Sequence, residues 1–421
     1  MTVALERAGL HYLGPVSLSP TLLSQGQPMS ARIAAAAVMF ISAGPLAAQA
    51  PTTAYIVTRL GVDTVAIERY TRSPSKLEGD VVVRNPRVQT FHYVADLGAS
   101  GQLKNFHLTT RRADAEPLAP PRLEVVDTFG DSIAVVEVTR AGARDTTLSG
   151  HQAFHGRPAV AFPNTPPAYG IYEQILANSA LKGDSVAYAL IGRPGADLSS
   201  IILRRRGTDS VAFRSTWFPN WIEVARVDSR GRILGVNSTA TTVKTMAETA
   251  PGLDFDRVAL GWAAAEKAKG PAGLVSPPDT VRATIGGANI VVAYSRPAKR
   301  GRVIFGNIVP WNQVWRTGAN AATMFTTDKD LVFGSTVVPA GKYTLWTLPT
   351  PSGAKLIFNS QTGQWGTDYN SDKDFARVDL TSKQMSPPVD QFVIGVVPQG
   401  SGGLLRYAWD DREYSIPFTV K

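Results

Sequence analysis

The chain has 421 residues, of which 44% are hydrophobic and 18% are charged, so it can build two buried cores and lacks the composition of a disordered protein. It contains no cysteine, which excludes disulfides, thiolate nucleophiles, thiolate metal ligands and lipid attachment to an N-terminal cysteine. The net charge of +9 suits an anionic partner, but the basic residues are scattered. We expect the densest clusters, RRR at 204–206 and KRGR at 299–302, to be a solvated strand face and a charged turn.

Residues 29–50 have the order of a secretory signal. They begin with Met29, carry Arg32, run apolar over 33–41, break at Gly-Pro and end in the small-x-small triplet that closes at Ala50. The apolar run is too short for a membrane span, which takes about 20 residues. We therefore expect translation to start at Met29, cleavage near Ala50 and export to the periplasm or the extracellular space. No later stretch is long and apolar enough to cross a bilayer.

Residues 52–250 consist mainly of short segments in which apolar and polar residues alternate, separated by turn residues. The predicted strands lie at 63–72, 76–85, 88–97, 101–110, 131–140, 184–192, 200–217 and 222–239. Asp228 to Gly231 predicts a hairpin turn. Strands at this spacing predict an antiparallel meander in one large curved sheet or barrel.

One helix interrupts this series at about 168–180. Its apolar stripe consists of Tyr169, Tyr172, Ile175, Leu176 and Ala180. A single helix against a curved meander can close or fill a barrel. The interior is then either a cavity for an apolar ligand or an ordinary core of side chains, and the sequence leaves both open.

Residues 251–278 predict a short amphipathic helix followed by a linker rich in Gly and Pro. Beyond this boundary the strand pattern returns, at 280–285, 289–297, 341–349, 354–360 and 391–399. Residues 404–420 predict a hairpin that turns at Asp410 to Arg412. About eight strands without a long helix predict an antiparallel β-sandwich over 279–421, so the whole fold is expected to be all-β.

The second half carries a specific combination of short motifs. They are YSRP at 294–297, GR at 301–302, IFG at 304–306, VP at 309–310, VWRTGAN at 314–320, PAGKY at 339–343, and Asn359 with QWG at 364–366. This combination resembles the family called domain of unknown function 2911 (DUF2911), over essentially the whole of 279–421. The resemblance implies no established activity, and it does not extend to residues 52–250.

Several of these motif residues suit a ligand: Arg296, Arg302, Trp315, Arg316, Asn320, Asn359 and Trp365. The arginines offer planar donors for carboxylate, phosphate or sulfate, and the tryptophans can stack on sugar rings or a cation. The competing interpretation is structural. In it, Arg316 is buried against a carboxylate such as Asp368 and Trp315 belongs to the core.

Catalytic and metal sites have little support in the sequence. Residues 279–421 contain neither histidine nor cysteine, which removes the usual general base and the common nucleophile pairs. His151 and His155 are four residues apart, but their neighbours indicate a loop or strand, where that spacing does not converge on a metal. Nucleophile elbows and phosphate-cradling loops are missing. We expect no catalytic residue, no metal and no cofactor.

The sequence therefore favours an exported, non-catalytic binding or scaffold protein of the bacterial envelope, with a small-molecule ligand that is lipid-like, anionic or a glycan. Export argues against a nucleic-acid partner, and nothing sets the oligomeric state. The alternative is a cofactor-independent hydrolase of envelope polymers that uses Arg296, Arg316 and a carboxylate such as Asp368. A buried, paired Arg316 would contradict the hydrolase, whereas a deep apolar cavity beneath the helix at 168–180 would favour ligand carriage.

Overall fold

The computed structural model describes residues 51–421 with short gaps, at 113–114, 116–118, 142–145, 162–167, 179–184, 193, 196, 198 and 217–220. The expected signal segment and start at Met29 lie outside the described residues, as does the end of the helix predicted at 168–180. The described residues all belong to one compact unit. None of the helices in the described part of the chain has the length and apolar character that a membrane crossing requires.

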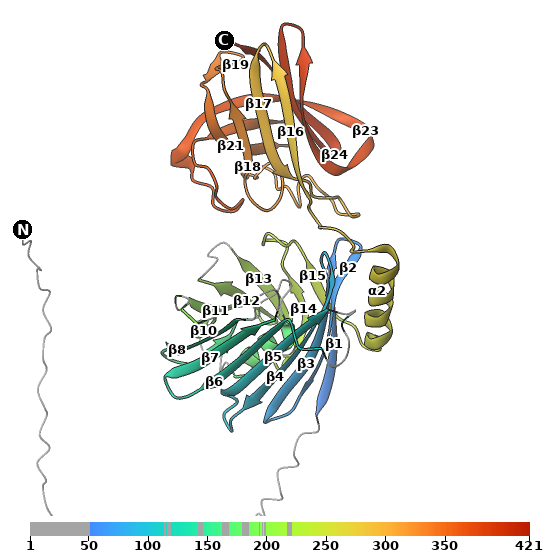
Figure 1. Ribbon diagram of the computed structural model, residues 1–421, viewed down its shortest axis with the longest axis vertical. Coiled ribbons are helices and arrows are strands. Elements are labelled where there is room, and N and C mark those ends of the chain that lie inside the picture. Colours follow the sequence, from blue (N-terminus) through green and yellow to red (C-terminus); the bar gives the residue numbers. More distant parts are fainter. Residues whose placement is uncertain are drawn as a thin grey trace, which may run out of the picture. The chain divides into compact units, whose positions relative to one another are not determined.

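The first sheet takes up the described residues between 52 and 249, and Figure 1 shows its strands in blue to green. Its strands are β1 (Thr52–Leu60), β2 (Asp63–Arg72), β3 (Lys76–Arg84), β4 (Val88–Leu97), β5 (Leu103–Arg112), β6 (Leu123–Phe129), β7 (Ile133–Arg140), β8 (Thr146–Ala153), β9 (Pro158–Val160), β10 (Ser185–Ile191), β11 (Ser199–Arg206), β12 (Ser210–Ser215), β13 (Ile222–Val227), β14 (Ile233–Asn237) and β15 (Met246–Thr249). Their hydrogen-bonded order is β8-β7-β6-β5-β4-β3-β2-β1-β15-β14-β13-β12-β11-β10-β9. We call this the N-terminal sheet.

The N-terminal sheet is the antiparallel meander that the alternating pattern predicts. Neighbouring strands pair antiparallel, except that β9 runs parallel to β10. The sheet is strongly curved, and the edge strand β8 lies close to the chain that follows β10, near the opposite edge. The backbone N–H of Gly192, just after β10, donates to Oε1 of Gln152 in β8 at 3.2 Å.

The helix α1 (Tyr169–Asn178) belongs to the core inside this curved sheet, as the sequence predicts. Ile171 and Ile175 join a cluster that also contains Phe91 and Tyr93 of β4 and Phe213 of β12. The same cluster thus draws on strands from both halves of the sheet. The helix fills part of the interior, because these strands turn every second side chain inward.

A buried carboxylate holds the start of α1. Glu68 of β2 accepts hydrogen bonds from the backbone N–H groups of Tyr169 (2.8 Å) and Gly170 (3.0 Å), and from the hydroxyl of Tyr93 (2.7 Å). The first N–H groups of a helix have no partner within the helix. The side chain of Glu68 therefore does the work of a helix cap from a distant strand.

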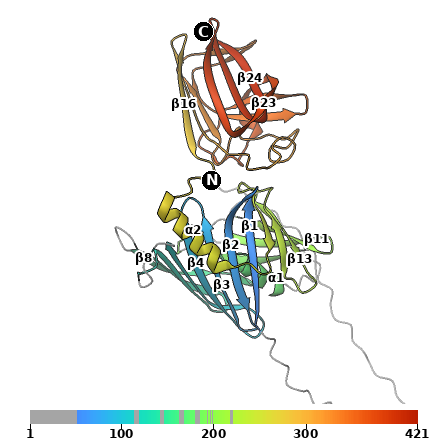
Figure 2. The same ribbon diagram turned by 90° about the vertical axis from the view of Figure 1, so that its right-hand side faces the viewer.

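The predicted second helix is α2 (Phe255–Lys269), which starts at the N-cap Asp254. It contacts β2 and β4, and Figure 2 shows it lying across these strands. Phe255 packs with Ile67 and Val82 in a cluster separate from the interior core, on the opposite face of the sheet. Arg69 lies over the ring of Phe255 at 4.6 Å from its centroid. The apolar cluster on this outer face therefore lies where α2 covers the sheet.

The second sheet, which we call the C-terminal sheet, consists of β16 (Pro278–Ile285), β17 (Ala288–Ser295), β18 (Thr323–Thr327), β19 (Leu331–Phe333), β20 (Thr336–Val338), β21 (Gly341–Thr350), β22 (Gly353–Asn359), β23 (Asp374–Gln399) and β24 (Gly402–Val420). A short 3-10 helix spans Ser371–Lys373. The strand order is β16-β17-β18-β21-β22-β23-β24-β19-β20, with antiparallel pairing. The all-β fold class is confirmed for both sheets.

The hairpin predicted at 404–420 is wrong. These residues belong to the single long strand β24, which pairs with β23 along its length. The polar sequence at Asp410 marks an irregularity in the ladder, because Asp410 has a left-handed φ of 53° and the register shifts on both sides of its partner Val389. A β-bulge and a hairpin turn favour the same polar residues, so the sequence pattern does not separate them.

The core of the C-terminal sheet is rich in aromatic side chains. Trp315 stacks on Trp409 with ring centroids 6.0 Å apart, and it meets Phe392 edge to face at 5.3 Å. The first strand, β16, contacts β23 without being its hydrogen-bonded neighbour, so the sheet folds back over itself. Trp315 is therefore a core residue at one end of this fold, as the structural interpretation of the VWRTGAN motif predicts.

Candidate functional site

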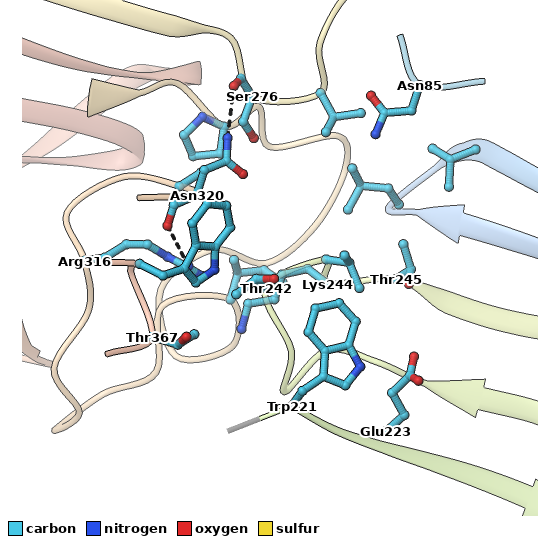
Figure 3. Close-up of a pocket in the computed structure, with 18 of the residues that line it drawn as sticks. Asn85, Trp221, Glu223, Thr242, Lys244, Thr245, Ser276, Arg316, Asn320 and Thr367 are labelled. Atoms are coloured by element: carbon cyan, nitrogen blue, oxygen red, sulfur yellow. Dashed lines mark hydrogen bonds between the residues drawn. The ribbon is translucent and has the colours of Figure 1, made fainter. Parts of the chain in front are cut away.

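The described residues line a cavity of about 880 Å³. Its lining comes from both sheets. Figure 3 shows Arg316, Asn320 and Thr367 along one side and Trp221 and Glu223 along the other. Cavities of this size hold small organic ligands in many proteins.

The VWRTGAN motif forms the loop that leads into β18, and two of its residues have left-handed backbone conformations. Thr317 has φ 51° and Asn320 has φ 60°. This conformation is unusual for the β-branched Thr317. It is held from both sides, because the carbonyl of Thr317 accepts from the hydroxyl of Thr323 at 2.8 Å and its own hydroxyl bonds that of Thr347 at 2.8 Å. Backbone strain that is held so firmly occurs often at functional sites.

This loop places the guanidinium of Arg316 at the cavity in an unusual state. The side chain is buried, and Nη1 donates to the backbone carbonyl of Asn320 at 3.2 Å. Among the described residues it forms no salt bridge, so the predicted pairing with Asp368 is wrong. Burial lowers the pKa of Arg316 to about 10, with no carboxylate close enough to offset it.

A glycine makes room for this arginine. A Cβ atom on Gly366 would lie 2.2 Å from Cδ of Arg316 and 2.5 Å from the carbonyl oxygen of Asn320. The backbone N–H of Gly366 donates to that same carbonyl at 3.0 Å. The QWG and VWRTGAN motifs therefore belong together, because the first supplies the surface over which Arg316 extends.

Two further cations line the same cavity. Burial, and then the positive charges of Arg316 and Arg302, lower the pKa of Lys244 to about 8. Its ammonium donates to the backbone carbonyl of Thr239 at 2.7 Å. Arg302 donates to the carbonyls of Lys299 and Ala298 at 3.0 and 2.6 Å. Burial, and then the charge of Arg300, lower its pKa, while the carboxylates of Asp390 and Asp63 act against this fall.

The three cations form a cluster that lacks a directly bound carboxylate. Within the described residues, Lys244, Arg302 and Arg316 bond only to neutral backbone carbonyls, and the pKa of Lys244 responds to both arginines. Buried charges in proteins are normally paired, because removing a charge from water without a partner is costly. An arrangement of this kind fits an anion that enters the cavity from outside the chain.

Asn320 and Trp365 complete the polar end. The amide of Asn320 donates to the carbonyl of Ser276 and to the hydroxyl of Ser295, each at 3.4 Å, and these are long, weak bonds that a ligand can replace. Trp365 leaves 44% of its surface exposed and lines the cavity. Trp315 contributes only at its edge, since most of it lies in the core.

Two carboxylates also line the cavity. Glu223 is buried, and it accepts from the hydroxyls of Ser238 (2.5 Å) and Tyr172 (3.3 Å). Burial raises the pKa of Glu223, which favours its neutral form. Asp368 follows the QWG motif, and its backbone N–H donates to the carbonyl of Trp365 at 3.0 Å.

Five of the seven residues singled out in the sequence line this cavity together: Arg302, Trp315, Arg316, Asn320 and Trp365. The other two do not. Arg296 forms a salt bridge with Asp279 at 3.3 Å and donates to the carbonyl of Phe392, so it ties β17 to β16 and β23. Asn359 is fully buried and bonds Asp374 and the carbonyl of Asn370, both at 2.8 Å, which fixes a turn in the C-terminal sheet.

The sequence gives no sign of Lys244, Trp221 or Glu223 as members of this site. They lie in the N-terminal sheet or its loops, and nothing in their local patterns distinguishes them from ordinary strand and turn residues. Among the histidines, His92 bonds Asp80 at 2.9 Å and His107 bonds Glu124 at 2.8 Å, on strand surfaces. The described residues contain no cluster of three or more His, Asp or Glu side chains that could hold a metal ion.

The solved structures that resemble this chain at low similarity include the following two. One is a DUF1089 family protein from Pseudomonas aeruginosa, with 10% identity, a TM-score of 0.28, and coverage of 42% of this chain and 90% of that chain. The other is a β-barrel-like protein of the domain of unknown function DUF1849 from Brucella abortus, with 10% identity, a TM-score of 0.30, and coverage of 47% and 93%. Likenesses this weak carry no argument about ligand or activity.

A family model matches only the C-terminal part of the chain. A search of curated proteins finds no match. Residues 276–418 match the model of the family described as "Protein of unknown function (DUF2911)". The match covers both motifs that position Arg316 at the cavity. The C-terminal sheet is therefore a domain of the DUF2911 family, as its motifs predict.

Proposed function

We propose that this chain is an exported, non-catalytic binding protein whose ligand carries a negative charge. The observation that supports the proposal is the buried guanidinium of Arg316, which faces a large cavity without a carboxylate partner among the described residues. Lys244 and Arg302 add positive charge at the same place. A protein that only needed a stable core would gain by replacing such a charge with an apolar side chain.

An anion would relieve the unfavourable electrostatics of this cluster. It would pair with the planar donors of Arg316, return the pKa of Lys244 toward its ordinary value, and reduce the repulsion between the cations. The anion gains affinity because the electrostatic free energy of the cation cluster is lower in the occupied cavity than in the empty one. Asn320, whose amide is held only by bonds of 3.4 Å, is free to turn toward the ligand.

Export is part of the same proposal and depends on the sequence of residues 29–50. It is tested by expressing the full chain in a Gram-negative bacterium, fractionating the cells and determining the N-terminus of the product. We expect a periplasmic or secreted protein that begins near residue 51. A cytoplasmic product that retains residues 29–50 would contradict export, without affecting the binding proposal.

Binding is tested by isothermal titration calorimetry with phosphate, sulfate and short carboxylates on the purified chain. Arg316→Gln is expected to weaken binding by at least about 30-fold, or about 2 kcal/mol, because the anion loses its main partner in a buried setting. Lys244→Gln tests the same cluster from the other sheet. The control is Lys355→Gln, whose ammonium is exposed and paired with Asp379 at 2.5 Å. Equal affinities for all four proteins would contradict the proposal.

The alternative is a hydrolase of envelope polymers. The observation in its favour is that the cavity contains two carboxylates, Glu223 with a raised pKa and Asp368. A pair of acids whose environments differ suits general acid–base chemistry. Turnover of envelope glycans that disappears in both Glu223→Gln and Asp368→Asn would establish this function. Arg296, which the sequence favours for it, is tied to Asp279 and does not line the cavity.

A further inference from the structure

The cavity is larger than the cationic cluster needs, and much of its remaining wall is apolar. That wall comes from the N-terminal sheet: Leu60, Val65, Val160, Leu190, Ile201 and Phe213. The first two lie on β1 and β2, and the other four lie on the strands from β9 to β12. The ring of Phe213 stacks on that of Tyr172 of α1, which also lines the cavity, with centroids 4.7 Å apart. The apolar wall is therefore formed by well-packed side chains.

The carboxyl of Glu223 and the hydroxyl of Tyr172 are already satisfied, whereas the buried hydroxyl of Thr245 has no hydrogen-bond partner among the described residues. Glu223 bonds Ser238 and Tyr172, so neither its carboxyl nor the Tyr172 hydroxyl needs a partner from a ligand. A glycan that entered this part would lose water from its hydroxyl groups and meet hydrocarbon, which is unfavourable. A hydrocarbon chain has no hydrogen bonds to water to give up, and it would gain about fourfold in affinity for each methylene that it buries.

We propose that the ligand is a long-chain amphiphile with a carboxylate or phosphate head group. The head group binds Arg316 and Lys244, and the chain lies along Val160, Ile201 and Phe213. This inference rests on the proposed function, since it assumes that the cationic cluster binds an anion. It adds the chemical class of the ligand and the direction in which the ligand lies in the cavity.

The geometry gives the two ends of the cavity different roles. Figure 3 shows Arg316 and Asn320 on the side formed by the C-terminal sheet, and Trp221 and Glu223 on the side formed by the N-terminal sheet. A ligand with charge at one end and hydrocarbon at the other matches this separation, because each end meets the environment that suits it. A purely anionic ligand would leave the apolar wall in contact with water.

The proposal is tested by a chain-length series. Saturated carboxylates and alkyl phosphates of six to twelve carbons are titrated, below their micellar concentrations, into the purified chain after bound lipid is removed. Fluorescence of the tryptophans and calorimetry report binding. The affinity is expected to rise about fourfold per methylene until the wall is filled. The two head groups distinguish a fatty acid from a phosphorylated lipid as the source of the anion.

A blocking variant separates the chain from the head group. Ala161 lines the apolar part of the cavity and is partly exposed at the margin of the interior core, so Ala161→Phe adds bulk to the cavity wall. It is expected to reduce the affinity for the twelve-carbon ligands to that for the six-carbon ligands, while the short anions bind as before. The control is Ala264→Phe on the exposed face of α2, which leaves the whole series unchanged.

Each of the remaining outcomes contradicts a specific part of the proposal. If short anions bind through Arg316 but affinity does not change with chain length, the amphiphile is wrong and the proposed anion-binding function stands. If neutral alkyl alcohols bind as tightly as the anions of equal length, the head-group assignment is wrong. If sulfated oligosaccharides bind more tightly than every amphiphile, the ligand is a glycan and the inference is overturned. If nothing binds, the inference and the proposed function both fail.

Discussion

Nη1 of Arg316 donates to the backbone carbonyl of Asn320, 3.2 Å away, and this neutral acceptor is the arginine's hydrogen-bond partner among the described residues. The loop that places the two residues so close has left-handed backbone at Thr317 and Asn320. A buried guanidinium with one carbonyl for a partner contributes little to stability. The arrangement is better explained by what it offers to a ligand, and this difference can be measured.

Arg316→Met tests whether the arginine serves the fold or the ligand. Methionine keeps much of the volume and removes the buried charge, so the free energy of unfolding is expected to stay the same or to rise by about 1 kcal/mol. Stabilisation of the protein by phosphate or by an anionic amphiphile is expected to vanish. Thermal and urea unfolding, with and without anion, measure both effects.

The matched control is Arg377→Met. The guanidinium of Arg377 pairs with Asp374 at 2.6 Å, so its loss leaves a largely buried carboxylate without its cation, and a fall in stability of about 1 kcal/mol is expected. Stabilisation by anions should remain. If Arg316→Met instead lost more than about 3 kcal/mol and still responded to anions, Arg316 would have the structural role that its motif also allows.

Gly366→Ala tests the contact between the two motifs. The new Cβ would lie 2.2 Å from Cδ of Arg316, so the arginine or the backbone must move. We expect a loss of about 1–3 kcal/mol in stability, because the site is closely packed, and a weaker affinity for anions. Gly353→Ala is the control, since a Cβ there meets no atom within 4 Å. Unchanged anion affinity in Gly366→Ala would show that the position of Arg316 does not matter for binding.

The fold was largely predictable because its signals are local. Alternation of apolar and polar residues predicts β2 and β4 with their observed bounds, since each strand turns one face to the core. The stripe that contains Tyr172 and Ile175 predicts α1 for the same reason. The hairpin at Asp410 failed because a bulge within β24 uses the same residues as a turn.

The site was only half predictable, because it depends on contacts between distant parts of the chain. The motifs of the DUF2911 domain predict Arg316 and Asn320 as a pair, since both belong to one short loop. Nothing local indicates Lys244, which reaches the cavity from the loop between β14 and β15. The burial that makes Arg316 unusual is also a property of the assembled structure, and the residue type alone predicted a carboxylate partner.

The affinity for anions should depend on pH near 8. Burial and the neighbouring arginines lower the pKa of Lys244 to about 8, so in the empty cavity this residue loses its charge as the pH rises through that value. A bound anion favours the charged form, so binding takes up protons near pH 8 and weakens above it. Calorimetry in buffers of different ionisation enthalpy measures this uptake. Lys244→Gln should abolish the uptake, and a pH dependence that persists in this variant would assign it to another group.

The affinity for anions should fall as the pH rises, whereas the contribution of Lys244 to the stability of the anion-free protein should rise with pH. The pKa is lower in the folded state than the ordinary value of 10.5, so between about pH 8 and 10.5 the unfolded chain binds more protons than the folded protein. The contribution of Lys244 to the free energy of unfolding therefore rises with pH over that window. Unfolding by urea at several pH values, in the absence of anions, should show a slope that Lys244→Gln reduces.

Glu68 should make the N-terminal sheet less stable as the pH rises toward neutrality. Burial raises the pKa of Glu68 from 4.5 to about 7, although the N–H groups of Tyr169 and Gly170 and the hydroxyl of Tyr93 act against the rise, and the nearby Glu173 adds to it. Between about pH 4.5 and 7, Glu68 therefore keeps its proton in the folded protein but has lost it in the unfolded chain. The stability that this group contributes is fully present below about pH 4.5, and about 3 kcal/mol of it is lost as the pH rises through about 7.

The loss is expected to be visible first in α1, because Glu68 caps its first N–H groups. Hydrogen exchange at the start of α1, followed from pH 5 to pH 8 and corrected for the intrinsic rate, should show protection that declines as Glu68 ionises. Glu68→Gln keeps the shape without the titration. It should remove the pH dependence at the cost of about 1–3 kcal/mol, since its amide NH₂ cannot accept the bond from one of the two backbone donors. A slope that survives in Glu68→Gln would point to the other buried acids of this interior, Asp127 and Glu223, whose pKa values burial also raises.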